Sequence, residues 1–160
     1  MGETVIARER PDSPDAAALV EELEAHLAGF YAKESRHGLS VERLVREQVA
    51  FFIARHDGEA VGCGGVQLFG REYAEVKRMW VRPQFRGLGL GALMLRQLEA
   101  HARDHQMPVL RLETGIYQHA AIALYEKHGF RQIPPFGPYW NDPVSRCYEK
   151  VLRYNGAPGL

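Results

Sequence analysis

Glycine alternates with leucine in a short stretch whose residue types could bind phosphate. The stretch is Arg86-Gly87-Leu88-Gly89-Leu90-Gly91-Ala92, between a strand-like run at 76–81 and a helix-like run at 92–104. Unpaired backbone N–H groups at the start of a helix attract an anion, as does the positive end of the helix dipole. Glycine has no side chain that would block the close approach of a phosphate. The stretch therefore predicts a site for a phosphate-bearing ligand.

Two familiar phosphate loops fit this stretch incompletely. A P-loop needs Lys and then Ser or Thr straight after its last glycine, but Ala92 and Leu93 follow here. The dinucleotide fingerprint fits Gly87-x-Gly89-x-x-Ala92, and Glu113 ends a later strand where an acid could bind ribose. In that motif the strand runs almost directly into the first glycine, whereas residues 82–86 intervene here. A dinucleotide-binding oxidoreductase stays open as an alternative.

A third pattern uses more of the chain. Arg86-x-x-Gly89-x-Gly91-Ala92 resembles the pyrophosphate loop of the GNAT N-acetyltransferases, and Val81-Arg82-Pro83 resembles its usual lead-in. Residues 121–130, Ala-Ile-Ala-Leu-Tyr-Glu-Lys-His-Gly-Phe, resemble the family's second signature, A-x-x-L-Y-x-x-x-G-F. The two motifs lie at the family's usual separation and cover roughly a third of the chain. This resemblance implies acetyl-CoA as cosubstrate and direct transfer of its acetyl group to an amine.

Acetyl transfer to an amine needs a proton acceptor for the nitrogen and a proton donor for the departing thiolate. The resemblance makes Tyr125 the candidate acid at the thioester sulfur, with a core aromatic on an amphipathic helix as the alternative. It makes Glu75, at the start of the strand before the glycine loop, the candidate base. Pairing of Glu75 with Lys77 on the surface is the alternative, and Glu113 is a second candidate base.

The resemblance also implies how acetyl-CoA is held. The family's sheet splays beside the glycine loop and leaves backbone groups free for the pantetheine arm, here those of Met79, Trp80 and Val81. The pyrophosphate would bind the loop residues Arg86, Gly87, Leu88, Gly89, Leu90, Gly91 and Ala92. Gln118 stands seven residues before Tyr125, where many members have an Asn. Its amide is expected to contact the cofactor.

The periodicity of the chain predicts a single α+β domain, 1–160, with a mixed, mainly antiparallel central sheet, and the resemblance implies the three-layer GNAT topology. Strands are expected at 4–8, 49–55, 60–69, 72–81, 109–114, 130–133 and 145–152. Helices are expected from Pro14, over 40–48, after the glycine loop and over 118–128, with a tail at 154–160. Glycines 62, 64 and 65 predict a bulge or a close backbone contact. Alternation with a period of two predicts that residues 75, 77, 79 and 81 share one face.

The composition limits the classes of partner. The 20 basic and 20 acidic residues give a formal net charge of zero, so the overall basic charge typical of nucleic-acid binding is absent. No apolar run reaches the roughly 18 residues of a membrane span, and Cys63 and Cys147 are typical of reduced cytoplasmic thiols. His101 and His105 have metal-ligand spacing, but a helix C-terminus itself favours His, and no metal is expected.

The acceptor is expected to be an amine of a small molecule or a peptide, and a homodimer is compatible with the sequence. The polar segment 31–39 borders the acceptor site in the family. The stiff aromatic loop 134–140 is expected to wall the acceptor pocket. A non-catalytic acetyl-CoA sensor on the same fold is the further alternative, and the presence of Tyr125 argues against it.

Overall fold

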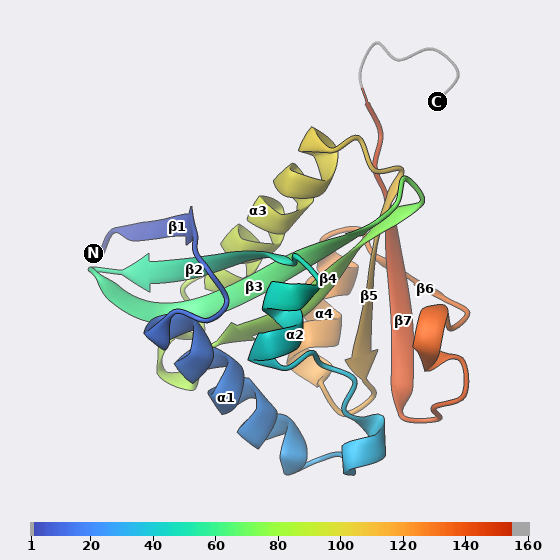
Figure 1. Ribbon diagram of the computed structural model, residues 1–160, viewed down its shortest axis with the longest axis horizontal. Coiled ribbons are helices and arrows are strands. Elements are labelled where there is room, and N and C mark those ends of the chain that lie inside the picture. The colour runs from blue at the N-terminus through green and yellow to red at the C-terminus, as the bar shows by residue number, and fades with distance from the viewer. Residues whose placement is uncertain (1, 155–160) are drawn as a thin grey trace.

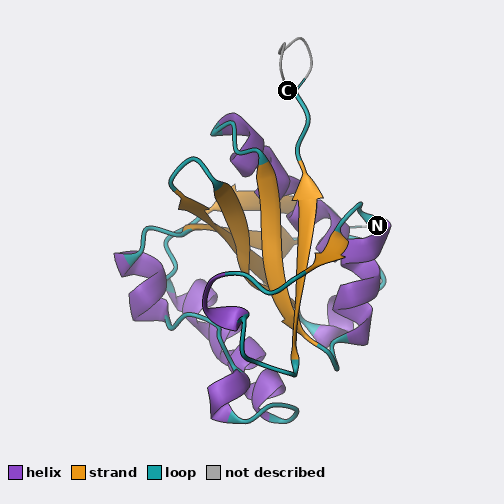
Figure 2. Ribbon diagram, turned by 90° about the vertical axis from the view of Figure 1, so that its right-hand side faces the viewer, coloured by secondary structure: helices purple, strands orange, loops and turns teal. Residues whose placement is uncertain are grey.

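The computed structural model describes residues 2–154 and places one seven-stranded sheet between two layers of helices (Figures 1 and 2). The order of strands across the sheet is β1-β2-β3-β4-β5-β7-β6. The β4–β5 pair is parallel and every other neighbouring pair is antiparallel. The strands are β1 (Thr4–Arg8), β2 (Ala50–His56), β3 (Glu59–Phe69), β4 (Tyr73–Val81), β5 (Val109–Gly115), β6 (Arg131–Ile133) and β7 (Ser145–Val151). The predicted α+β fold with a mixed, mainly antiparallel sheet is confirmed, while the predicted tail, beyond Tyr154, lies outside the described residues.

The helices begin where the sequence supplies capping groups. In α1 (Pro14–Ala28) the Ser13 side chain accepts from the Ala16 N–H, and in α2 (Val41–Arg46) Ser40 accepts from the Arg43 N–H. The expected helix over 40–48 is shorter than predicted, because Gln48 has a φ of 57° and leaves the right-handed region. On the other face lie α3 (Leu90–Asp104) and α4 (His119–Lys127).

Alternate residues of the central strands supply two separate cores, which is why both faces need helices. Phe51 and Ile53 of β2 pack with α1 and α2, whereas Phe52 and Ala54 pack with α3 and α4. Four of the helix residues that complete the two cores, Leu19, Leu44, Leu95 and Leu98, are less than 3% exposed. Burying a side chain of this size stabilises the fold by about 1.5–3 kcal/mol.

The two strands at the centre of the sheet separate soon after they pair. In β4 and β5 the Cα partners are limited to Ala74 with Leu110 and Glu75 with Arg111. Beyond Glu75, the edge of β4 that faces β5 therefore keeps backbone groups that this ladder does not use. The sheet opens into a cleft at this place.

A bulge in β4 turns its side chains to the opposite faces. The β3–β4 register shifts between Cys63 and Gly65, as the glycines predict, and Arg78 has a φ of 52°. The prediction that residues 75, 77, 79 and 81 share one face is therefore wrong. Glu75 and Lys77 contact Tyr139, whereas Met79 and Val81 pack against the core that contains α3.

Candidate active site

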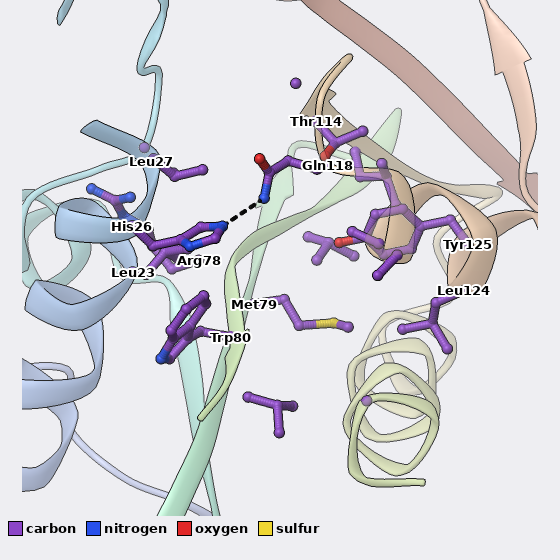
Figure 3. Close-up of a pocket in the computed structure, with 18 of the residues that line it drawn as sticks. Leu23, His26, Leu27, Arg78, Met79, Trp80, Thr114, Gln118, Leu124 and Tyr125 are labelled. Carbon is purple, nitrogen blue, oxygen red and sulfur yellow. Dashed lines mark hydrogen bonds between the residues drawn. The ribbon is translucent and has the colours of Figure 1, made fainter. Parts of the chain in front are cut away.

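A cavity of about 720 Å³ lies where β4 and β5 separate, between α1 on one side and α4 on the other (Figure 3). Its lining includes both candidate bases, Glu75 and Glu113, together with Tyr125 and Gln118. It also includes Met79, Trp80, Val81 and every predicted residue of the glycine loop except Leu88. The side chain of Leu88 is exposed instead. The fold thus brings these predicted residues, which lie up to 50 positions apart in the chain, into one cavity.

The glycine loop adopts a conformation that favours glycine. Gly87 and Gly89 have φ values of 86° and 78°, and Gly89 is the N-cap of α3. No side chain caps this helix start. The N–H groups of the first helical turn have no partner within the helix, so they remain available to an anion. This arrangement fits the pyrophosphate of a coenzyme.

The wall beside the loop is fixed by Trp80. The Arg86 guanidinium carbon lies 4.9 Å from the centre of the indole ring, and Arg86 Nε donates to the Val81 carbonyl over 3.1 Å. The imidazole of His26 packs on the indole at 5.1 Å between ring centres. Burial, and then the charge of Arg86, lowers the pKa of His26. Three segments are therefore held together at this end of the cavity.

Tyr125 projects from α4 into the cavity (Figure 3). Its side chain is buried, yet its hydroxyl makes no hydrogen bond to the described part of the chain. The hydroxyl oxygen itself is not fully shielded from solvent. Burial, with a smaller contribution from Glu113, raises the pKa of Tyr125 to about 12. The hydroxyl therefore keeps its proton at neutral pH and is free to donate it to a group in the cavity.

Gln118 bridges the cleft in this structure. Its Nε2 lies 3.2 Å from His26 Nε2, the bond dashed in Figure 3, and its Oε1 accepts from the Tyr31 hydroxyl over 3.3 Å. The same hydroxyl accepts from the Tyr117 N–H over 3.0 Å. The amide of Gln118 therefore faces the cavity, and a contact with the cofactor would replace or share these bonds.

Glu75 lies in a dense polar cluster and is 2% exposed. Its Oε2 accepts from the Tyr139 hydroxyl over 2.6 Å and lies 3.0 Å from Lys77 Nζ. Lys77 also donates to the Tyr139 oxygen over 3.1 Å. The predicted pairing of Glu75 with Lys77 is thus present, but it is buried and joined to the cavity through Tyr139.

Tyr139 comes from the aromatic loop 134–140 and lines the cavity, whereas the neighbouring Trp140 is 72% exposed. Burial, followed by the charge of Glu75, raises the pKa of Tyr139. The loop was expected to wall the pocket, but no sequence signal singled out Tyr139 as the partner of Glu75. The two residues lie 64 positions apart, and only the folded chain brings them together.

Glu113 of β5 is the other carboxylate in the cavity. It accepts from Ser145 Oγ over 2.6 Å. Burial raises the pKa of Glu113; Ser145 and His37 oppose that rise, and the nearby charges of Glu75 and Asp142 add to it. A carboxylate with a raised pKa is a stronger proton acceptor than an exposed one, which suits a general base.

His37 and Asp142 form a pair that the sequence analysis missed. His37 Nε2 lies 2.7 Å from Asp142 Oδ2, and the residues are 105 positions apart, so no local spacing could have indicated the contact. His37 lines the same cavity.

Within residues 2–154 no group of three or more His, Cys, Asp or Glu could hold a metal. None of the helices in this range combines the length and the hydrophobicity that a membrane span requires.

Known proteins are similar to this chain in sequence and in fold. A sequence model of the Acetyltransferase (GNAT) family matches residues 16–130. A protein named IAA acetyltransferase from Azospirillum brasilense is 42% identical over 153 residues, covering 95% of this chain and 100% of its own.

Solved structures give the same result. One, assigned as an acyl-CoA N-acyltransferase of Klebsiella pneumoniae, is 37% identical, with a TM-score of 0.80 over 94% of this chain and 98% of its own. A GNAT acetyltransferase of Elizabethkingia anophelis with acetyl-CoA bound shares the fold, with a TM-score of 0.70 over 93% of this chain and 98% of its own at 19% identity. The chain therefore belongs to the GNAT acetyltransferase family, whose cosubstrate is acetyl-CoA.

Proposed function

We propose that this protein is a cytoplasmic N-acetyltransferase that moves the acetyl group of acetyl-CoA directly to an amine of a small molecule or peptide. The observation that carries the proposal is one cavity that joins the uncapped start of α3 at Gly89 to the free hydroxyl of Tyr125. A phosphate site and a proton donor are the two features that a CoA thioester requires at its opposite ends.

In this proposal, backbone groups of the protein bind most of the length of the coenzyme. The N–H groups after Gly89, with Arg86 beside them, bind the pyrophosphate. The pantetheine arm follows the unpaired edge of β4 at Met79, Trp80 and Val81, where β5 has moved away. When bound, acetyl-CoA supplies a thioester carbon that an amine can attack.

The proton balance of the reaction assigns roles to the side chains. An acceptor arrives as an ammonium ion, because the pKa of an alkyl amine is about 10, and its nitrogen loses two protons to become an amide. One proton ends on the CoA sulfur and one is released. Tyr125 is the proposed donor to the sulfur. Its free hydroxyl in the cavity supports this role.

Glu75 remains the proposed base, and its hydrogen bond with Tyr139 supports a relay. The acceptor nitrogen would give its proton to the Tyr139 oxygen as the Tyr139 proton moves to Glu75, 2.6 Å away. Lys77 stabilises the carboxylate before transfer. Glu113, whose pKa is raised, is the second proposed base in the same cavity.

A screen of amines tests the proposal. The full chain is incubated with acetyl-CoA and with amino acids, polyamines, aminoglycoside antibiotics and peptides that have free N-termini, while free CoA is measured. We expect release of CoA that depends on one class of amine and yields an N-acetylated product by mass spectrometry. Tight binding of acetyl-CoA without acetylation of any amine would favour a sensor. Binding of NADH in place of acetyl-CoA would favour the dinucleotide alternative.

A further inference from the structure

The pair His37–Asp142 holds an imidazole in one orientation at the part of the cavity that Tyr139 lines. Asp142 Oδ2 lies 2.7 Å from His37 Nε2, and its Oδ1 accepts from the Val144 N–H over 3.0 Å and from Ser35 Oγ over 3.3 Å. Burial acts to raise the pKa of Asp142, but the bonds from His37, Val144 and Ser35 outweigh burial, and the pKa is lowered. The carboxylate is therefore charged and fixed.

The second ring nitrogen of His37 is available to a ligand. A neutral imidazole that donates from Nε2 to a carboxylate carries its lone pair on Nδ1. Nδ1 makes no hydrogen bond to residues 2–154, and it is not fully shielded from solvent. The edge of the ring packs against Tyr139, with 5.2 Å between ring centres and an interplanar angle of 76°. His37 therefore presents a proton acceptor beside the residue that connects Glu75 to the cavity.

A second acceptor would serve the reaction, because the nitrogen loses two protons and the Glu75–Tyr139 relay takes only one at a time. We propose that His37, oriented by Asp142, is a catalytic residue that takes the first proton from the acceptor ammonium at Nδ1. The N–H bond breaks, its electron pair stays on nitrogen, and the resulting imidazolium is stabilised by Asp142. The second proton leaves through Tyr139 to Glu75. This inference rests on the proposed function.

Several charged and titratable groups surround the imidazole. Asp142 comes from the turn before β7, Glu113 from β5, and Tyr139 from the aromatic loop. Glu75 and Lys77 of β4 act through Tyr139, and Arg36 precedes His37 in the chain. Because these groups interact, a pH–rate profile reports the cluster, and the His37 contribution must be taken from the difference between variants.

The test compares His37→Ala and His37→Gln with a matched control, His56→Ala. His56 also lies near an aspartate, 3.9 Å from Asp57, but outside the cavity. The probe is whichever of L-phenylalanine, tyramine, spermidine and the dipeptide Ala-Phe the wild-type enzyme acetylates best. We expect both His37 variants to bind acetyl-CoA with unchanged affinity and to lose roughly 10²-fold in kcat, and His56→Ala to lose none.

Two further readouts separate proton transfer from a structural role. Free imidazole should restore part of the activity of His37→Ala, and this rescue should saturate. It should not restore activity to Asp142→Asn, because that variant still contains the His37 imidazole. The acid limb of the pH–rate profile should change in both His37 variants. A His37→Gln enzyme within twofold of wild type overturns the inference. A loss of kcat in His37→Ala without imidazole rescue, and with an unchanged pH profile, overturns it equally.

The inference can fail independently of the proposed function. If wild type acetylates the probe and the His37 variants do so equally, the inference alone fails. If no probe is acetylated, the slow hydrolysis of bound acetyl-CoA is measured instead, because attacking water must also lose a proton in the cavity. Equal hydrolysis by wild type and His37→Gln overturns the inference, and a selective loss in His37→Gln supports it.

Discussion

The Tyr125 hydroxyl is the group on which the proposed chemistry depends most. It is buried in α4, free of hydrogen bonds to residues 2–154, and protonated at neutral pH because burial raises its pKa to about 12. A core aromatic, the alternative considered from sequence, would direct its ring inward just as well. The open hydroxyl inside the cavity is what a packing role does not explain.

Replacing Tyr125 by Phe removes this oxygen and little else. We expect unchanged affinity for acetyl-CoA and a fall in kcat of roughly 10²–10⁴-fold, because a general acid contributes that much. The loss should shrink with a thioester whose leaving thiol is more acidic, since that thiolate needs a proton less. Calorimetry and steady-state kinetics on the variant measure both quantities.

The pH profile gives this prediction its control. A raised pKa means that Tyr125 holds its proton to higher pH than a free phenol, whose pKa is about 10. Up to about pH 10, the activity of wild type and of the Phe variant should therefore depend on pH in the same way on the alkaline side. A fall near pH 9 that disappears in Tyr125→Phe would mean that the hydroxyl is not buried as described.

Glu75 and Tyr139 should behave as one unit if they form a relay. Tyr139→Phe removes the 2.6 Å bond, and Glu75→Gln removes the carboxylate that would take the proton, so each should lower kcat at neutral pH, by roughly 10²-fold. The double variant should be no slower than the worse single variant. The losses should diminish toward pH 10, where the free amine already dominates. Additive losses in the double variant would contradict a shared path, and an unchanged kcat in Glu75→Gln would favour Glu113 as the base.

At the level of elements, the sequence predicted what local chemistry dictates. Ser13, Ser40 and the glycine loop mark helix starts, and each of the three helices begins beside them. The φ of 52° at Arg78 could not be predicted, because a non-glycine residue adopts it only when the surrounding structure compensates. Because of that bulge, Lys77 and Met79 lie on opposite faces of the sheet. A period of two therefore placed Met79 and Val81 on the wrong face.

The conformation of Gly89 makes a matched experiment available. Gly89 and Gly58 have similar φ values, 78° and 84°, and a Cβ at either position would meet nothing within 4 Å. Only Gly89 lies at the proposed pyrophosphate site, since Gly58 is in the β2–β3 turn. We expect Gly89→Val and Gly58→Val to lose similar stability, about 1–3 kcal/mol, in chemical denaturation.

Acetyl-CoA affinity should separate the two variants. Calorimetry should show binding abolished in Gly89→Val, because the β-branched side chain covers the N–H groups of α3, and retained in Gly58→Val. Retention of full affinity by a folded Gly89→Val would place the pyrophosphate elsewhere.

At the scale of the whole molecule, the site exists only because the sheet and both helical layers meet. His37 comes from the chain between α1 and α2, Glu75 from β4, Tyr125 from α4 and Tyr139 from the loop before β7. Local pattern cannot predict such contacts, nor the insertion of β7 between β5 and β6. The resemblance predicted Tyr125 because a motif spans its helix, whereas His37, Asp142 and Tyr139 belong to no such motif.

The antiparallel order of β1 to β4 also bears on the dinucleotide alternative. A dinucleotide domain alternates parallel strands with helices from its start, but here the first three strand pairs are antiparallel. One parallel pair, β4–β5, flanks the cleft. The molecule therefore offers a coenzyme a splayed sheet edge, which suits an extended pantetheine arm.

A rapid-quench single turnover tests direct transfer most sharply. Enzyme in excess is mixed with acetyl-labelled acetyl-CoA, with and without the best amine of the screen, and free CoA, labelled protein and labelled amine are quantified over time. The account predicts that CoA and N-acetyl amine appear together, in equal amounts and with one rate constant, only when the amine is present. Release of CoA with acetylated protein before the amine is added, or an amine that leaves acetyl-CoA intact, would contradict it.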